Sequence, residues 1–424
     1  MMWPFYKMSQ VAEINPRDSH WKKLPDDTMV SFVPMPAVSE ITASIEDAEI
    51  RPLGEVRRGY TYFRDNDVLF AKITPCMENG KVALAQHLKS GLGFGSTEFH
   101  VIRSKDGVLP RYLYFFVRQP SFRRHAKQRM RGAAGQQRVP KQFLVDYLIP
   151  LPPPSEQRRI VELLDRADAL RRMRRDADAL AERVLPALFY QMFGDPATNP
   201  MGWPQKPLSS LCKIVSGATP KTKIESYYGG SICWATPKDL SELQGWVIEK
   251  TARTLTEEGY QSSSTTLVPP GTVLVSSRAP IGLLAIAGTE LCTNQGIKSL
   301  VPGPEIDSWY LFAWLYLRRS YLESLGRGAI FKEISTKILG SLEIPIPPLS
   351  VQKTWADRIQ DHLEIICLAQ KNKQALDDLF TLMLQRAFSG ELTAAWREAH
   401  LKELLQEMET QARHLGLSQS TQPT

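Results

Sequence analysis

The stretch that decides the organisation of this chain reads Ile149-Pro150-Leu151-Pro152-Pro153-Pro154-Ser155-Glu156-Gln157. It returns 195 residues later as Ile344-Pro345-Ile346-Pro347-Pro348-Leu349-Ser350-Val351-Gln352. Each copy opens a segment with helical apolar spacing, and the two segments stay in register as far as Phe193 and Phe388. The period exceeds the roughly 20–50 residues of a solenoid repeat, so it predicts two whole modules, each a globular part followed by a helix. Two similar recognition modules suggest a binding partner with two similar parts, and DNA is the obvious candidate.

The composition is that of a globular protein with room for two or three domains: 424 residues, 43% apolar and 23% charged. The formal net charge of +7 suits a polyanionic partner. Five cysteines are scattered without a CxxC pair, which favours free thiols in a reducing compartment over disulfides or a zinc site. No apolar run suits a signal peptide or a membrane span, so we expect a cytoplasmic protein without membrane contact.

One long helix is predicted from Ser155 to about Phe193, with Ser155 as its N-cap and a length of about 50–60 Å at ~1.5 Å per residue. The two helical segments share an apolar stripe, which is Ile160, Leu163, Leu164, Ala167, Leu170, Ala177, Leu180, Val184, Leu188 and Met192 in the first and Trp355, Ile359, Leu363, Ile366, Leu376, Phe380, Met383 and Ala387 in the second. A lone helix would leave this stripe in water, so the two are expected to pack together as a coiled coil.

The globular parts are predicted to be mixed α/β, which makes the fold class α+β. Strand-like runs occur at 29–33 and 68–73, and a helical piece at 111–117. The predicted domains are a first globular domain at 1–148, a hinge and central helix at 149–194, a linker and second globular domain at 195–342, a hinge and C-terminal helix at 343–392, and a helical extension with a polar, disordered tail at 393–424.

Two differences separate the modules. The second opens with Trp203-Pro204-Gln205-Lys206-Pro207-Leu208, whereas the first joins its equivalent helix abruptly near Met8, which suggests an abbreviated or misplaced start of the first module. The second hinge has Val351 where the first has Glu156, so the capping of the two helices is expected to differ. The globular parts have diverged more than the helices, which indicates a shared structural role for the helices and different reading roles for the globular parts.

No catalytic constellation is recognisable. Gly80-Lys81 is followed by Val82, so there is no phosphate-binding P-loop, and no Glu has a Lys two residues later as in common nuclease motifs. Neither Asn15-Pro16 nor Asn199-Pro200 continues into the tetrapeptide of amino-methyltransferases, and the seven histidines stand singly. We therefore predict a binding subunit without catalytic, cofactor-binding or metal-binding residues.

A window without acidic residues runs from Val108 to Val145 and predicts a nucleic-acid surface. Lys and Arg at this density let phosphates replace counterions, and Gln amides can pair with purine edges. The simpler alternative is a solvated helix face, which explains most runs of charge. Together with one earlier lysine, the DNA-binding candidates of the first module are Lys72, Arg118, Arg123, Arg124, Lys127, Arg129, Arg131, Gln136, Gln137 and Arg138.

The second module has a looser basic set, which alone would not discriminate between DNA contact and ordinary surface. Its DNA-binding candidates are Lys221, Lys238, Arg278, Lys298, Arg327 and Lys332. The arginines of the first long helix are interleaved with Glu and Asp, and this balance favours a solvated coiled-coil face.

With the hinge present twice and further motifs in a fixed order, the chain resembles the DNA specificity (S) subunit of type I restriction–modification systems over essentially its whole length. The motifs are the two hinges, Gly59-Tyr60-Thr61-Tyr62-Phe63, Val68-Leu69-Phe70-Ala71-Lys72-Ile73-Thr74-Pro75-Cys76-Met77-Glu78-Asn79-Gly80-Lys81, Gly93-Phe94-Gly95-Ser96-Thr97-Glu98-Phe99, Ile214-Val215-Ser216-Gly217-Ala218-Thr219-Pro220, Trp234-Ala235-Thr236-Pro237-Lys238-Asp239-Leu240 and Phe388-Ser389-Gly390-Glu391-Leu392-Thr393.

The resemblance implies two target-recognition domains, each reading one half of a bipartite, asymmetric double-stranded DNA site. It implies an internal pseudo-two-fold repeat whose long helices are antiparallel and act as a ruler, about 55 Å or roughly 16 base pairs long. It also implies a non-catalytic subunit that recruits two modification subunits, which methylate adenine with S-adenosylmethionine, and ATP-driven restriction/translocase subunits. No cofactor is expected in this chain, and S-adenosylmethionine, Mg²⁺ and ATP are expected on the partners.

Two alternatives stay open at this point. The chain could be the specificity part of a single-chain restriction–methylation enzyme, or an overlooked nuclease, against which the missing catalytic motifs argue. It could also be a scaffold or decoy that holds modification subunits without reading DNA, which sequence-specific DNA binding by the complex would exclude.

Overall fold

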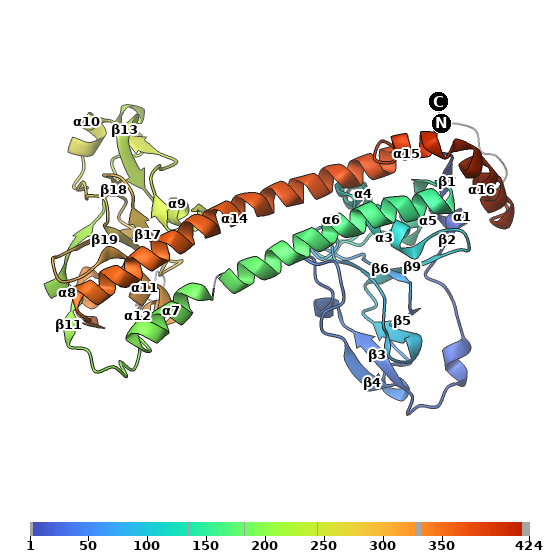
Figure 1. Ribbon diagram of the computed structural model, residues 1–424, viewed down its shortest axis with the longest axis horizontal. Coiled ribbons are helices and arrows are strands. Elements are labelled where there is room, and N and C mark those ends of the chain that lie inside the picture. Colours follow the sequence, from blue (N-terminus) through green and yellow to red (C-terminus); the bar gives the residue numbers. More distant parts are fainter. Residues whose placement is uncertain (1–2, 134, 182, 244, 327–332, 418–424) are drawn as a thin grey trace. The chain divides into compact units, whose positions relative to one another are not determined.

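The computed structural model describes residues 3–133, 135–181, 183–243, 245–326 and 333–417, and the side chains of 362–371 are not part of that description. The chain forms two compact units. Unit 1 comprises Met1–Met173 and Gln374–Thr424, and unit 2 comprises Arg174–Lys373. Both units mix helices with small sheets, so the predicted α+β class is confirmed (Figure 1).

The first long helix differs from the prediction. It is described as two helices, α6 (Pro154–Ala181) and α7 (Val184–Phe193), whereas the second copy forms one helix, α14 (Leu349–Ser389). Helix α6 begins one residue before Ser155, so the predicted N-cap role of Ser155 is wrong. A proline suits this first turn, because the first N–H groups of a helix have no partner within it.

Unit 1 contains two four-stranded sheets and one two-stranded ribbon. The sheet orders are β2-β9-β6-β7, which is antiparallel throughout, β4-β3-β8-β5, in which β3 and β8 are parallel, and β1-β10. The strands are β1 (Phe5–Lys7), β2 (Ala12–Ile14), β3 (Met29–Val33), β4 (Glu49–Pro52), β5 (Thr61–Arg64), β6 (Val68–Ala71), β7 (Val82–Leu84), β8 (Leu92–Gly95), β9 (Phe99–Ser104) and β10 (Leu148–Pro150). The strands predicted at 29–33 and 68–73 are therefore confirmed, the second in shortened form.

The helices of unit 1 gather around its main core. They are α1 (Met8–Val11), α2 (Leu53–Val56), α3 (Pro110–Arg118), α4 (Pro120–Gln128), α5 (Lys141–Asp146), α6, the end of α14, α15 (Ala394–Ala399) and α16 (Leu401–His414), with short 3₁₀ turns η1 (His20–Lys23), η2 (Met35–Ala37) and η3 (Lys89–Gly91). Helix α3 is the predicted helical piece at 111–117, and six consecutive residues of it are buried, Tyr112–Val117.

Unit 2 contains a five-stranded sheet, β12-β19-β16-β17-β14, a three-stranded sheet, β15-β13-β18, and the ribbon β11-β20. The strands are β11 (Gln205–Pro207), β12 (Cys212–Ser216), β13 (Tyr228–Ala235), β14 (Val247–Ile248), β15 (Thr254–Leu255), β16 (Val273–Ser276), β17 (Leu284–Ala287), β18 (Cys292–Thr293), β19 (Ile297–Pro302) and β20 (Glu343–Pro345). The helices are α7, α8 (Leu208–Leu211), α9 (Pro237–Glu242), α10 (Glu257–Gln261), α11 (Ser308–Leu317), α12 (Arg319–Leu325), α13 (Thr336–Gly340) and the start of α14, with the 3₁₀ turn η4 (Glu225–Tyr227).

The two units share one frame and differ outside it. The order β2-β9-β6-β7 of unit 1 recurs as β12-β19-β16-β17 in unit 2, whereas the second sheets have different strand numbers and orders. This is the pattern expected of a duplicated module of which one sheet has been kept and the other has diverged.

From Trp3 and Trp203 onward the two modules open alike, which corrects the expected difference between their described starts. Strand β1 pairs with β10 just as β11 pairs with β20. The backbone N–H of Leu151 donates to Pro4 O at 3.0 Å, and that of Ile346 donates to Pro204 O at 2.8 Å. Trp3-Pro4 is therefore the counterpart of Trp203-Pro204.

A buried glutamine organises each hinge in the same way. Gln157 donates to the carbonyl oxygens of Gly107 (3.2 Å) and Pro152 (2.8 Å), and its own carbonyl accepts from the N–H of Leu109 (2.8 Å). Gln352 repeats this in unit 2 with Glu305 O (3.2 Å), Pro347 O (2.8 Å) and the N–H of Asp307 (2.8 Å). Buried backbone groups need such partners because water does not reach them.

A buried tyrosine also recurs at each hinge. Tyr112 Oη donates to Pro150 O at 2.7 Å in unit 1, and Tyr310 Oη donates to Pro345 O at 2.6 Å in unit 2. Both acceptors belong to the last residue of the ribbon strand, β10 or β20, so the tyrosine ties the helix before each hinge to the hinge itself.

Within unit 1, α6 and the end of α14 run antiparallel. Arg171 Nε donates to Asp377 at 2.6 Å, while Glu156, fifteen residues earlier, accepts from Thr393 Oγ1 at 2.7 Å. Ile160 and Leu164 share one core with Phe380, Leu384 and Phe388. In unit 2 the end of α7 meets the start of α14 in an equivalent core, where Phe189 and Phe193 contact Trp355.

The helical extension predicted after 393 is confirmed as α15 and α16, and the predicted polar tail at 418–424 lies outside the described residues. Among the helices that the structure describes, none combines the length and apolarity needed to cross a lipid bilayer.

Candidate nucleic-acid interface

Most first-module candidates gather on α4 and the segment that follows it. Arg124, Lys127, Arg129, Arg131 and Gln136 are exposed, and Arg123 is half-buried. We call the set Arg123, Arg124, Lys127, Arg129, Arg131, Gln136 and Gln137 the α4 face. Helix α4 buries Phe122 and Ala126, which share one helix face because they lie four positions apart, and it exposes Arg124 and Lys127.

Arg123 is a cation without an acceptor among the described residues. Its guanidinium lies against the backbone of Gly80, where any Cβ would collide with Nη1, and its buried Nε has no hydrogen-bond partner. Burial, followed by the charge of Arg118, lowers the pKa of Arg123 from its ordinary value. A nearby anion would favour the charged form of this guanidinium and so oppose the effect of burial on its pKa.

Lys127 is available despite an ion pair. Its Nζ lies 2.7 Å from Glu78 Oε1, but the lysine side chain is 66% exposed. Such exposed pairs contribute about 0–1 kcal/mol, so a phosphate can compete for the ammonium group.

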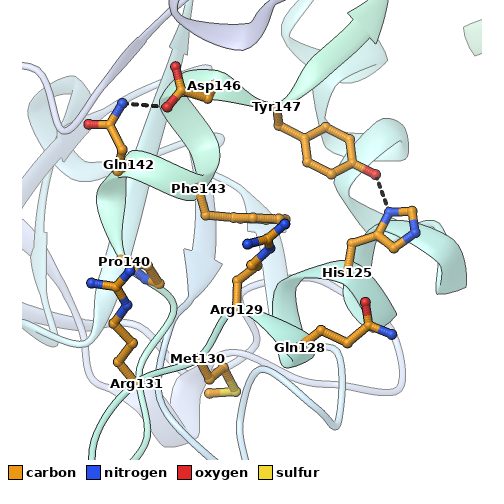
Figure 2. Close-up of a pocket in the computed structure, with 10 residues that line it drawn as sticks. All are labelled: His125, Gln128, Arg129, Met130, Arg131, Pro140, Gln142, Phe143, Asp146 and Tyr147. Atoms are coloured by element: carbon orange, nitrogen blue, oxygen red, sulfur yellow. Dashed lines mark hydrogen bonds between the residues drawn. The ribbon is translucent and has the colours of Figure 1, made fainter.

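A hollow of about 690 Å³ lies beside α4 (Figure 2). Its lining comprises His125, Gln128, Arg129, Met130, Arg131, Pro140, Gln142, Phe143, Asp146 and Tyr147. Two arginines line it against a single acid, and that acid, Asp146, is held by Gln142 at 2.5 Å and Lys7 at 3.0 Å. These two hydrogen bonds, Gln142 first, lower the pKa of Asp146, so its carboxylate stays charged. The lining is net positive because two arginines face this one carboxylate.

The loop after α4 is anchored at both ends. The backbones of Arg131 and Arg138 exchange two hydrogen bonds, at 3.0 and 2.8 Å. The guanidinium of Arg138 donates hydrogen bonds of 2.8–3.1 Å to the Glu98 carboxylate. These hydrogen bonds lower the pKa of Glu98 and raise the pKa of Arg138. Gln137 is fixed through its backbone to Thr74. The exposed side chain of Gln136 therefore lies on a loop whose ends are fixed by hydrogen bonds.

Two first-module candidates have local roles as well. Lys72 Nζ donates to Thr97 O at 2.6 Å, at the end of β6. Arg138 is committed to Glu98, so its contribution to a DNA surface is mainly the positioning of the loop. A backbone bridge between Ile73 and Arg138 brings the segment after β6 to the loop after α4.

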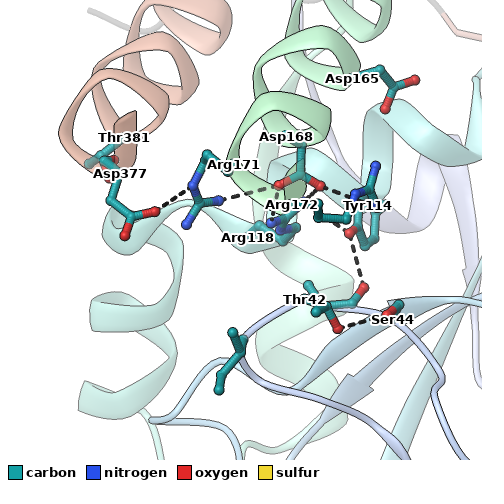
Figure 3. Close-up of polar contacts among 12 residues, drawn as sticks. Thr42, Ser44, Tyr114, Arg118, Asp165, Asp168, Arg171, Arg172, Asp377 and Thr381 are labelled. Carbon is teal, nitrogen blue, oxygen red and sulfur yellow. Dashed lines mark hydrogen bonds and ion pairs between the residues drawn. The ribbon is translucent and has the colours of Figure 1, made fainter. Parts of the chain in front are cut away.

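Arg118 has a structural role, which corrects its assignment as a DNA contact. Its side chain is 8% exposed and holds Asp168 of α6 through contacts of 3.1 and 3.2 Å (Figure 3). The same guanidinium donates to Tyr114 Oη at 2.9 Å and lies 5.0 Å from the ring centre of Phe380. Sequence alone did not reveal this, because Asp168 lies fifty residues further on.

Asp168 gathers three arginines of unit 1. Arg118, Arg171 and Arg172 all lie within ion-pair distance of its carboxylate, and Arg171 continues to Asp377 on α14 (Figure 3). Burial alone would raise the pKa of Asp168, but the charges of the arginines outweigh burial and the pKa is lowered. The cluster ties α3, α6 and α14 together within unit 1.

The second-module candidates do not form one face. Lys221 and Lys238 are exposed, and Lys238 makes only a loose pair with Glu242 at 3.7 Å. Arg278 pairs with Glu333 at 3.1 Å. Lys298 is a second correction: its side chain is 9% exposed and donates to Ser216 Oγ at 3.1 Å, so it supports the sheet instead of facing a ligand. Arg327 and Lys332 lie outside the described residues.

Arg253 is a candidate that sequence reasoning missed. Its guanidinium lies 4.2 Å from the ring centre of Tyr228 and 5.4 Å from that of Trp234, on an exposed side of the β13 sheet. A planar cation stacked on aromatic rings is suited to backbone or base contacts. No spacing rule links these three positions, since β13 and the segment before β15 meet only in the folded sheet.

The described cysteines are free, and burial raises the pKa of Cys212 to about 12 and of Cys292 to about 11. Thiols of this kind are inert at neutral pH. Within the described residues, no cluster of three or more His, Cys, Asp or Glu side chains could hold a metal ion.

A family model described as "Type I restriction modification DNA specificity domain" matches residues 2–177 and 200–377. The "Type I restriction enzyme EcoEI specificity subunit" of Escherichia coli is 42% identical over 160 residues, which are 38% of this chain and 26% of that protein. The "Putative type I restriction enzyme MjaX specificity subunit" of Methanocaldococcus jannaschii is 24% identical over 341 residues, 77% of this chain and 78% of that protein. The chain thus spans about a quarter of the length of the Escherichia coli relative.

Two solved structures share the fold. One, described as "Structural basis underlying complex assembly and conformational transition of the type I R-M system", has a TM-score of 0.56 at 24% identity and covers 92% of this chain and 98% of its own. The other, a "Type-I restriction-modification system S subunit from M. genitalium", has a TM-score of 0.56 at 12% identity and covers 91% of this chain and 96% of its own.

Proposed function

Because the chain belongs to the type I restriction modification DNA specificity domain family, we propose that it reads a bipartite, asymmetric site on double-stranded DNA. One observation carries this proposal. The hinge frame, with its glutamine, tyrosine and terminal ribbon, is the same in both units, while the second sheets differ. Two unlike readers on like frames suit two unlike half-sites.

In unit 1, the α4 face is the proposed phosphate-binding surface. Arg123 and Arg124 come from α4, and Arg129 and Arg131 follow it beside the hollow. Phosphate contacts position a reader on the duplex, whereas base-edge contacts carry sequence information. We assign the base-edge role to Gln136 and Gln137, whose amides suit adenine N6 and N7.

In unit 2, the proposed contacts are Lys221, Lys238 and Arg253, with Arg278 as a further candidate. Arg327 and Lys332 stay predictions from the sequence. Because Lys298 is committed to Ser216, it is left out of the proposed interface.

We propose that partner subunits carry out the methylation and cleavage of DNA. Two modification subunits would methylate adenine with S-adenosylmethionine, and restriction/translocase subunits would use ATP and Mg²⁺. This chain would then act without a cofactor as a non-catalytic specificity subunit, and the long helices would set the spacer between the half-sites. The family membership supports these assignments, together with the antiparallel contact of α6 and α14 in unit 1.

Adenine-methylation sequencing of cells with and without the gene tests the proposal. We expect one bipartite motif, with two fixed half-sites and a fixed unread spacer, to lose methylation when the gene is removed. A continuous motif would contradict the bipartite reading, and unchanged methylation would favour a scaffold or decoy. Methylation or cleavage by the purified chain alone, given S-adenosylmethionine, ATP and Mg²⁺, would show an enzyme.

A further inference from the structure

The C-terminal helices of unit 1 are seated on the first hinge. Glu407 on α16 accepts from both the N–H and Oγ of Ser155, at 2.9 and 2.7 Å. One turn later, Gln411 donates to Gly107 O at 2.8 Å and Pro152 O at 3.3 Å. These are the carbonyls that Gln157 already uses, and each has a second lone pair to offer. A carboxylate and a carboxamide four residues apart thus dock α16 on the hinge.

A second anchor fixes the segment that precedes α16. The Glu156 carboxylate is fully buried and accepts from Trp3 Nε1 (2.8 Å), Thr393 Oγ1 (2.7 Å) and Arg397 Nε (2.8 Å). The Arg397 guanidinium also lies 4.7 Å from the ring centre of Trp3. This anchor depends on a carboxylate at position 156.

Within unit 2, the second hinge presents the same seat, and no described helix of this unit other than α14 is hydrogen-bonded to it. Gln352 holds Glu305 O and Pro347 O as Gln157 holds its pair. Pro348 and Ser350 are exposed, whereas their counterparts Pro153 and Ser155 are buried and half-buried. Among the residues that the structure describes, nothing bonds to the N–H or Oγ of Ser350. The first-turn N–H groups of α14 also carry the positive end of the helix dipole, which favours a carboxylate there.

The indole of Trp203 marks a second difference between the two hinges. Its Nε1 is buried and finds no acceptor in the described parts of the chain, while the equivalent Nε1 of Trp3 donates to Glu156. Val351 stands where Glu156 stands in the first hinge, so unit 2 cannot satisfy the indole in the same way. A buried donor without a partner costs free energy, so this indole is less well satisfied than that of Trp3.

From these contacts we infer that the second hinge is a docking seat for an amphipathic helix of a partner subunit. That helix carries a carboxylate facing Ser350 and, one turn away, a donor facing Glu305 O and Pro347 O. The inference rests on the proposed function for the source of the helix, a modification subunit of the complex. A second copy of this chain fits less well, because its Arg397 would meet Val351 instead of a carboxylate, and its α16 is already seated on its own first hinge.

Site-directed photo-crosslinking of the complex of full-length chain and modification subunit tests the inference. We expect a photoreactive residue at position 350 to crosslink to the modification subunit, and one at Ser155 to crosslink to the chain's own C-terminal segment. Ser241, also exposed in unit 2, is the matched control and should give no crosslink. An assembled complex without a crosslink from position 350, or a crosslink there to a second copy of the chain, would overturn the inference.

A synthetic peptide of residues 400–417, added to the full-length chain alone, separates this inference from the proposed function. We expect the peptide to bind the second hinge, and Ser350→Glu to weaken binding at least tenfold by setting a carboxylate against Glu407. A peptide with Glu407→Lys should bind the wild-type chain correspondingly weakly. If the modification subunit fails to assemble with the chain, the proposed function is wrong, and the peptide experiment alone then tests the docking seat. A peptide that does not bind, or that binds the Ser350→Glu variant as well as the wild type, would contradict the docking seat.

Discussion

At the scale of residues, the structure separates arginines that hold the protein from arginines that face outward. Arg118 and Arg124 lie six positions apart in one acid-free window, yet the first is buried against Asp168 and the second is exposed on α4. This difference has consequences for stability that composition does not reveal.

Replacing Arg118 by Ala should destabilise unit 1 strongly, because it leaves Asp168 buried with fewer counter-charges. Breaking a buried pair from one side costs about 3–5 kcal/mol, which urea unfolding would measure. The control Arg124→Ala removes an exposed arginine and should change stability by less than about 0.5 kcal/mol. Equal effects of the two substitutions would mean that the Asp168 cluster does not stabilise the fold.

The lowered pKa of Asp168 predicts an acid-sensitive contribution to stability. Since the folded pKa lies below the unfolded value, the contribution is fully present above the unfolded pKa, about 3.9, and is lost as the pH falls through the folded pKa. Asp168→Asn should therefore be less stable than wild type at pH 7, and the gap should narrow below about pH 4. Urea titrations between pH 7 and pH 3 measure this, with exposed Asp106→Asn as the control. A gap that stayed constant with pH would contradict the assignment.

The α4 face predicts salt-dependent DNA binding. Replacing Arg123, Arg124, Lys127 and Arg129 by Ala should weaken binding by the assembled complex and flatten its dependence on salt, by about 0.9 in log–log slope for each phosphate that the variant no longer neutralises. Arg166→Ala is a suitable control, since Arg166 is exposed on α6 and paired with Glu162. Fluorescence anisotropy at several salt concentrations measures the affinity and its salt dependence. An unchanged slope would mean that these four residues do not contact DNA phosphates.

At the scale of elements, the repeat predicted the frame well. The helices at each hinge and the C-terminal helices follow from local signals, because proline and helical spacing act over a few residues. The ribbon strands were not predicted, because each pairs with a segment more than 130 residues away. The division between α6 and α7 and the buried roles of Arg118 and Lys298 could not be predicted. The two buried roles depend on partners such as Asp168 and Ser216, which lie fifty or more residues away along the chain.

The same scale carries the prediction for the long helices. Inserting one heptad within 163–183 together with one within 358–378 adds about 10 Å of helix, or roughly 3 base pairs. Methylation sequencing should then show a longer spacer with both half-sites unchanged. A heptad keeps the apolar stripe in phase, whereas a four-residue insertion in only one helix serves as a control that should disturb assembly. A changed half-site sequence would contradict the proposal that the long helices set the spacer length.

At the scale of the whole molecule, the duplication predicts independent readers. Substitutions on the α4 face of unit 1 should relax one half-site, and Lys221→Ala with Lys238→Ala in unit 2 should affect only the other. A methylated-site survey of each variant distinguishes the two. If either set altered both half-sites, the two units would not be separate readers.

The composition of unit 1 has a further consequence for biosynthesis. Unit 2 is one continuous segment, whereas unit 1 needs both the first 173 residues and the segment from Gln374 onward. During synthesis on the ribosome, the apolar face of α6 therefore stays uncovered until Phe380, Leu384 and Phe388 have been made. All residues of unit 2 have been synthesised before that point. At about 5–20 residues per second, synthesis of that last segment takes roughly 3–10 s. The half of the protein that is made first is thus the half that finishes folding last, and its exposed apolar helix is the part of the nascent chain most in need of protection.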